Sequence, residues 1–139
     1  MRALSMTGGP GSLTAMQAIK RAVFRWVFMA LFLGLAPVSL ALIGAAALGF
    51  AGPAARPVAA AGGVYLLGCF GVTVVFNVPM NERLAAMDPA SATSQIYWTG
   101  TYLPRWTWWN TVRTVACALS AALLLIALAS LSAHANGAP

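Results

Sequence analysis

Long stretches without charge are the feature that most constrains how this chain can fold. Residues 26–55 carry no charged side chain, and a second uncharged run extends over residues 57–81. Of the 139 residues, 60% are hydrophobic and only 7% are charged, whereas soluble domains average about 25% charged residues. A helix of about 20 apolar residues crosses the hydrocarbon core of a bilayer. This composition therefore excludes a water-soluble globule and indicates a membrane protein.

Three such helices account for most of the chain. We predict an all-α transmembrane helical bundle that forms a single membrane domain over residues 1–139. Its three spans are predicted at residues 26–50, 58–78 and 107–131. The connection at 79–106 is rich in aromatic residues, which favour the depth of the lipid headgroups, so we expect an interfacial helix there.

Local signals predict the ends of these helices. Asp88 followed by Pro89 is typical of an N-cap and a first helical position. Pro104 lacks a backbone N–H, and we expect it to end the interfacial helix. Near the N-terminus, Thr14 and Gln17 have the spacing of a capping box, which predicts a further helix start.

The distribution of basic residues predicts an orientation. Seven of the eight Lys and Arg side chains lie before the first span, in the connection or just after it, and only Arg56 lies on the opposite side. Cytoplasmic segments carry the excess of Lys and Arg. We therefore expect a multi-pass protein of the cell inner membrane, with the N-terminal segment and the 79–106 connection in the cytoplasm and the C-terminus outside.

The few charged and metal-binding residues limit the classes of partner. The net charge of +6 does not indicate nucleic-acid binding, because the basic residues are scattered and flank apolar runs. Cys69 and Cys117 lie deep in apolar segments, as packing residues do, and His134 is the only histidine. Haem, non-haem iron and zinc need several such ligands. We expect no metal and no cofactor, with the lipid bilayer as the main surroundings.

Polar side chains recur along two of the predicted spans. On the second span they recur every four residues, at Tyr65, Cys69, Thr73, Asn77 and Asn81. On the third they share one side of a helix, at Trp106, Trp109, Asn110, Arg113, Cys117 and Ser120. A polar side chain inside a span is costly unless it faces protein or a cavity. We therefore predict a polar pocket between these two spans that opens toward the cytoplasm.

The residues alone leave the role of this pocket open. Arg113 needs a partner or a route to the interface, and Glu82 is the expected partner. The arginine can anchor the helix through a structural ion pair, or it can hold a substrate anion. Similarly, Asn77, Asn81 and Asn110 can bond between helices or bind substrate, and the tryptophans can form an aromatic belt or a stacking surface.

Three sequence blocks resemble a known family. They read FNVPMNERLAAMDPASA at 76–92, YLPRWTWWN at 102–110 and WNTVRT at 109–114, and residues 15–34 are similar too. The blocks resemble the anthrone oxygenase-like family of small integral membrane proteins over most of residues 15–131. Individual members of that family oxidise anthrones to anthraquinones with molecular oxygen and no evident cofactor. The matching positions are Asn77, Pro79, Asn81, Trp109, Asn110, Arg113 and Thr114.

The resemblance implies an oxygenase with a lipophilic, anthrone-like polycyclic phenol and oxygen as substrates. In that scheme Arg113 and Asn110 hold the substrate anion, and Asn77 and Asn81 orient it. Trp106 and Trp109 stack on the rings of the substrate. The family usually has a histidine directly after the second-block asparagine, where this chain has Thr111. Glu82 is then the candidate base that takes the proton of the phenol.

Two further matters follow from the sequence. The family resembles a four-span bundle, so either three spans suffice here or the true start lies upstream of Met1, and we favour the second interpretation.

The alternative function is a non-enzymatic scaffold or accessory subunit, for which Ala41, Ala45 and Gly49 would offer a contact face of small residues. Whether the chain forms a homo-oligomer stays open.

Overall fold

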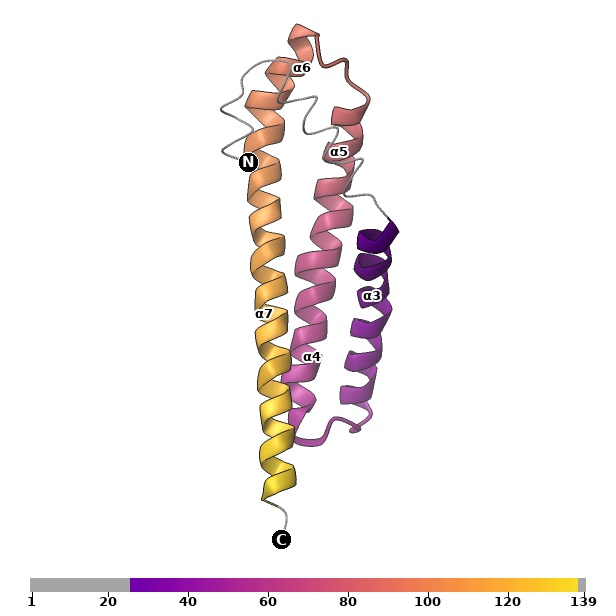
Figure 1. Ribbon diagram of the computed structural model, residues 1–139, viewed down its shortest axis with the longest axis vertical. Coiled ribbons are helices and arrows are strands. Elements are labelled where there is room, and N and C mark those ends of the chain that lie inside the picture. The colour runs from indigo at the N-terminus through magenta and orange to yellow at the C-terminus, as the bar shows by residue number, and fades with distance from the viewer. Residues whose placement is uncertain (1–25, 138–139) are drawn as a thin grey trace. The chain divides into compact units, whose positions relative to one another are not determined.

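The computed structural model describes residues 26–137, and these residues are helical almost throughout (Figure 1). The elements in chain order are α3 (Trp26–Ala47), η1 (Gly52–Ala54), α4 (Ala55–Val64), η2 (Tyr65–Gly71), η3 (Thr73–Asn77), α5 (Val78–Ala85), α6 (Ala92–Tyr97), η4 (Trp98–Tyr102) and α7 (Leu103–Asn136). The segments η2, η3 and η4 are wound as π-helix. No strand occurs in this range. The predicted all-α class is confirmed.

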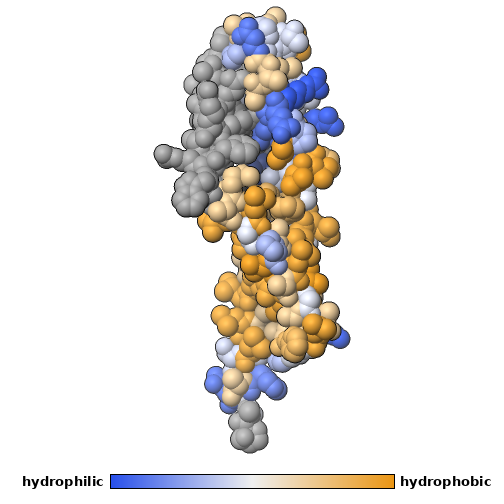
Figure 2. Space-filling view, turned by 90° about the vertical axis from the view of Figure 1, so that its right-hand side faces the viewer, coloured by the Kyte–Doolittle hydropathy of each residue, from blue (hydrophilic) through white to orange (hydrophobic). Residues whose placement is uncertain are grey.

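Three helical stretches are long and apolar enough to cross a membrane: Met29–Ala47, Gly52–Ala85 and Ala92–Asn136. Large apolar side chains on them are exposed, for example Leu67 at 78% and Leu125 at 67%. In Figure 2 the surface of these helices is mostly orange, the colour of hydrophobic residues. Such a surface is unfavourable in water and suits contact with lipid chains. The chain is therefore a multi-pass membrane protein.

The expectation that Pro104 ends a helix is wrong. The chain stays helical through Pro104, and α6 and η4 run without a break into α7. Just before the proline, the Leu103 N–H donates to the carbonyl of Trp98, a π-helical hydrogen bond. The backbone hydrogen bonds already change from the α-helical to the π-helical pattern at Leu103. Pro104, which lacks a backbone N–H, is therefore tolerated at the next position.

The predicted start of the interfacial helix is also wrong. The helix begins at Ala92, and its N-cap is Ser91, whose Oγ accepts a hydrogen bond from the Ser94 N–H at 3.1 Å. Asp88 instead accepts from the Ala90 N–H at 3.0 Å within the preceding turn. Asp is favoured both at helix N-caps and in turns, because its short side chain can accept a hydrogen bond from the backbone two residues ahead. The predicted capping box at Thr14 and Gln17 lies outside the described residues.

The described residues form two compact units. Unit 1 contains residues 26–31 and 73–111, and unit 2 contains residues 32–72 and 112–137. In unit 2, Figure 1 shows α3, α4 and the C-terminal half of α7 side by side. Their contacts are polar as well as apolar: the Ser120 hydroxyl of α7 donates to the carbonyl of Ala61 in α4 at 2.9 Å.

Glycines allow the helices of unit 2 to approach closely. A Cβ added at Gly62 of α4 would lie 2.8 Å from the backbone oxygen of Ser39 in α3 and 2.8 Å from Ile43 Cγ1. Apolar lipid chains provide no hydrophobic drive for helix association, so this close packing is what holds membrane helices together. The close contact lies here rather than at Ala41, which is exposed on α3.

Gly49 has a different role from the contact face that the sequence suggests. It adopts a positive φ of 83° directly after α3. Its N–H donates to Ala46 O at 3.2 Å, and the Phe50 N–H donates to Ala45 O at 2.9 Å. This pair of hydrogen bonds is the Schellman motif, which satisfies the last carbonyls of a helix and needs glycine at the left-handed position.

The close approach predicts opposite effects for two adjacent glycines. Gly62→Ala is expected to lower the free energy of unfolding by about 1–3 kcal/mol, because the methyl group meets backbone that cannot move aside. Gly63→Ala is the matched control, because nothing lies within 4 Å of its added Cβ and alanine favours helix. Thermal unfolding in detergent measures both. Equal melting temperatures would contradict the packing of α3 against α4.

Candidate functional site

An aromatic cluster forms the core of unit 1. Leu84, Tyr97, Trp98 and Tyr102 are buried, and Trp106 is among the half-buried residues that pack against them. The rings of Trp98 and Tyr102 stack at 5.2 Å between centroids, and those of Tyr102 and Trp106 at 6.2 Å. These rings come from η4 and the first turns of α7, so they line one side of a single helical segment.

A polar contact joins this segment to α5. The buried phenol of Tyr102 donates a hydrogen bond to Asn81 Oδ1 at 2.8 Å. In a medium without water such a pairing satisfies both groups, and it also fixes the direction of the Asn81 amide. Asn81 and Tyr102 therefore set the register between the two segments at this level.

A second contact sets the register further along. The rings of Phe76 and Trp109 stack face to face, with centroids 3.8 Å apart and planes 4° from parallel. Residue numbers fall on one segment, from Asn81 to Phe76, as they rise on the other, from Tyr102 to Trp109. The two segments of unit 1 are therefore antiparallel.

Two polar groups lie between these contacts and have no hydrogen-bond partner within residues 26–137. They are the side-chain amide of Asn77, whose nitrogen and oxygen are both unsatisfied, and the indole N–H of Trp106. Asn77 is only 3% exposed. It lies one turn before Asn81, while Trp106 lies one turn after Tyr102, so antiparallel helices place the two groups at the same level.

An unsatisfied buried polar group costs about 1–3 kcal/mol, so natural proteins keep one only for a reason. Asn77 can donate two hydrogen bonds and accept two, and Trp106 can donate one. Trp106 packs against the aromatic cluster of unit 1. We call Asn77, Asn81, Tyr102 and Trp106 the amide site. Its groups are complementary to a flat aromatic molecule that carries an oxygen atom.

The other predicted site residues lie on α5 and α7. Trp109 and Asn110 are half-buried on α7, within one turn of Trp106. Glu82 is exposed on α5 next to Asn81. Arg113 is half-buried one turn beyond Asn110 on α7, and it belongs to unit 2.

Thr111 occupies the position where the family usually has histidine. Its hydroxyl donates to the carbonyl of Thr107, one turn earlier on the same helix, at 2.9 Å. The side chain is exposed. Its hydroxyl is thus bonded to its own helix, and threonine has no group that takes up a proton near neutral pH.

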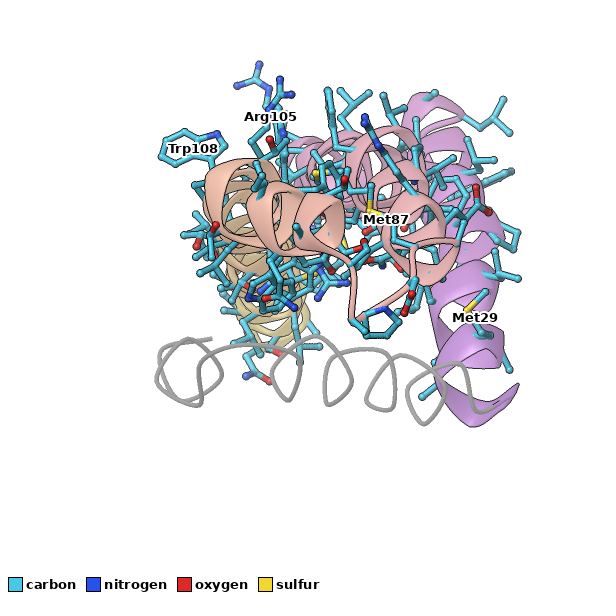
Figure 3. The ribbon with its side chains drawn as sticks, turned by 90° about the horizontal axis from the view of Figure 1, so that it is seen from above. Met29, Met87, Arg105 and Trp108 are labelled. Carbon is cyan, nitrogen blue, oxygen red and sulfur yellow. The ribbon has the colours of Figure 1, made fainter. Side chains whose placement is uncertain are left out.

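Outward-pointing residues on the same helix contrast with the amide site. Arg105 and Trp108 point away from the other segments of unit 1 (Figure 3), and Trp108 is 65% exposed. On α5, the Arg83 guanidinium lies 4.6 Å from the centroid of the Tyr97 ring, in a cation–π contact.

Among the described residues no three His, Cys, Asp or Glu side chains form a group that could hold a metal ion.

The sequence pattern does not single out Tyr102, a residue of the amide site, or Phe76, which stacks on Trp109. Tyr102 is one turn before Trp106 and would share its helix face, but only if the helix continues through Pro104. A helix that ended at Pro104 would not place Tyr102 and Trp106 on one face. Phe76 precedes Asn77 and carries no polar signal, so its stacking on Trp109 is a matter of register alone.

Comparison with known proteins gives one match. The family model described as anthrone oxygenase matches residues 21–123, which is more than half of the chain. No curated protein and no solved structure matches. The family match covers every residue of the amide site and all three blocks on which the resemblance depends. The chain therefore belongs to the anthrone oxygenase family.

Proposed function

We propose that this protein oxidises a lipophilic, anthrone-like polycyclic phenol with molecular oxygen. The observation that carries the proposal is the buried, unsatisfied amide of Asn77, which lies at the same helical level as Trp106, a residue packed against the aromatic cluster. An oxygen atom of the substrate would be the missing hydrogen-bond partner of the Asn77 amide. The flat rings of the substrate would exchange their contacts with lipid for contacts with aromatic side chains. The family to which the chain belongs supports the same chemistry.

In this proposal each residue has a defined task. Asn77 and Trp106 donate hydrogen bonds to the oxygen of the bound substrate, and Asn81, held by Tyr102, orients it. Trp109 flanks the rings. Asn110 and Arg113 stabilise the anion that forms on deprotonation, a role that rests on the sequence pattern. Glu82 accepts the proton, and its exposure on α5 lets it return that proton to water.

The reaction balances without a cofactor. Loss of a proton converts the anthrone to its phenolate-like anion, which can give an electron to oxygen. One oxygen atom then bonds to the methylene carbon and becomes the second carbonyl of the quinone. The other oxygen atom leaves as water with the two hydrogens of that carbon. Hydrogen-bond donors aimed at the developing anion lower the barrier of the first step.

The location of the protein is part of the proposal. The basic residues support an inner-membrane protein whose N-terminal segment and 79–106 connection face the cytoplasm, with the C-terminus outside. A lipophilic substrate and oxygen would both reach the site from the bilayer. Attachment of a dye to single cysteines introduced at Ala90 and Ala133 would test which side each segment faces.

Asn77→Leu should separate a binding role from a structural one. We expect kcat/KM for an anthrone to fall by about 10- to 100-fold, since a hydrogen bond to a charged group contributes ~1.5–3 kcal/mol and ~1.4 kcal/mol is tenfold in rate. Stability should stay the same or rise, because an unsatisfied buried amide is removed. Oxygen uptake and thermal unfolding measure the two effects.

The matched control is Asn81→Leu, which leaves the Tyr102 phenol without its acceptor. This variant should lose about 1–3 kcal/mol of stability. If Asn77→Leu were instead the less stable of the two and retained full turnover, the amide of Asn77 would be structural and the proposal would fail.

Arg113→Ala tests the proposed anion clamp. Removal of the guanidinium should lower kcat by about 10²–10³-fold, the usual effect of losing one donor to a developing oxyanion. Arg105→Ala is the control on the same helix, because Arg105 is exposed and points outward (Figure 3). Unchanged turnover in Arg113→Ala would favour the scaffold or accessory role.

Thr111→His tests the missing family histidine. An imidazole at this exposed position should raise kcat, and the gain should appear as pH rises through about 6.5, where histidine becomes a neutral base. In this background Glu82→Gln should cost less activity than it does in the unaltered protein. A pH–rate profile that is the same with Thr111 and with histidine would argue against a base at this position.

A further inference from the structure

Two thiols meet in the interior of unit 2. The Cys117 thiol of α7 donates a hydrogen bond to the sulfur of Cys69 in η2, with the sulfur atoms 2.9 Å apart. Both cysteines are in the reduced form in this structure. They are 48 positions apart in the chain, so no local pattern brings them together. Neither belongs to the amide site.

The backbones also come close at this level. A Cβ added at Gly68, the neighbour of Cys69, would lie only 2.5 Å from the Cβ of Ala116, the neighbour of Cys117. A disulfide needs Cβ atoms about 3.5–4.5 Å apart and a sulfur–sulfur bond of about 2.05 Å. The two helices thus approach closely beside the cysteines, and the sulfur atoms, 2.9 Å apart, need to move together by only about 1 Å to form the bond.

The surroundings of Cys69 are mostly apolar. Cys69 is 4% exposed and packs with Phe32, Tyr65 and Phe70. Reagents dissolved only in water cannot reach the pair, so its oxidant has to dissolve in the bilayer.

We propose that Cys69 and Cys117 form a reversible intramembrane disulfide, with a lipid-soluble quinone as the oxidant. Each thiol loses its hydrogen, and one sulfur–sulfur bond forms. The two electrons and two protons pass to the two oxygens of the quinone, which becomes a hydroquinone. The bond joins η2 to α7 covalently within unit 2. This inference is independent of the proposed oxygenase activity.

The test uses the full chain in lipid vesicles. The reduced protein is treated with duroquinone, whose fully substituted ring cannot add to a thiol, and is then denatured and cut with trypsin. Arg83 and Arg105 lie between the two cysteines in the sequence, so cleavage separates them. We expect the fragments containing Cys69 and Cys117 to migrate together without reductant and to separate with dithiothreitol. Ferricyanide, which does not enter the bilayer, should produce at least tenfold less of this cross-link.

The matched control moves one thiol by one helical position. Cys117→Ala combined with Ala118→Cys keeps the number of thiols but turns the second one away, because position 118 is exposed on α7. This variant should form at least tenfold less cross-link than the unaltered protein.

Three results would overturn the proposal. In the first, both thiols of the folded unaltered protein still react with maleimide after quinone treatment. In the second, the displaced variant cross-links as fast as the unaltered protein. In the third, the only disulfides that form join two copies of the chain.

Discussion

The structure depends on the absence of water from the bilayer core, which leaves every polar group to find its partner inside the protein. The helices satisfy the backbone, and side chains satisfy one another or a carbonyl. In unit 2 the Tyr65 phenol donates to Phe32 O at 3.0 Å and the Ser120 hydroxyl donates to Ala61 O at 2.9 Å. Each of these bonds joins two helices, so polar residues within the spans specify which helices pack together.

The amide site is an exception to this rule, because two of its buried polar groups are not satisfied within the protein. The Asn77 amide and the Trp106 indole N–H are buried and have no hydrogen-bond partner among the described residues. Other polar groups of the site, such as the Asn81 Oδ1 and the Tyr102 phenol, bond to each other within the protein. Groups that serve a ligand are satisfied only when the ligand is bound. This difference distinguishes Asn77 and Trp106 from the polar residues that bond within the protein, and spacing alone does not reveal it.

Winding of the helices contributes to the same arrangement. In an α-helix, residues four apart drift around the axis, because 3.6 residues complete a turn. A π-helix has more residues per turn, so four residues there fall short of a full turn. The π-helical segments η2 and η3 each keep a pair of polar residues buried, Tyr65 with Cys69 and Thr73 with Asn77. Such windings are frequent at functional sites, and they explain how a polar residue every four positions avoids lipid.

The sequence by itself determined the medium, the all-α class, the three apolar helices and the family, because composition and local periodicity carry that information. It also identified Asn77, Asn81, Trp106 and Trp109 as residues of interest. It misjudged Pro104 and Asp88, whose effects depend on neighbouring hydrogen bonds. Only the tertiary structure decided which side chains meet: Tyr102 with Asn81, Phe76 with Trp109, and Cys69 with Cys117. Those pairings depend on the register between helices distant in the chain, and register is set by packing rather than by any local pattern.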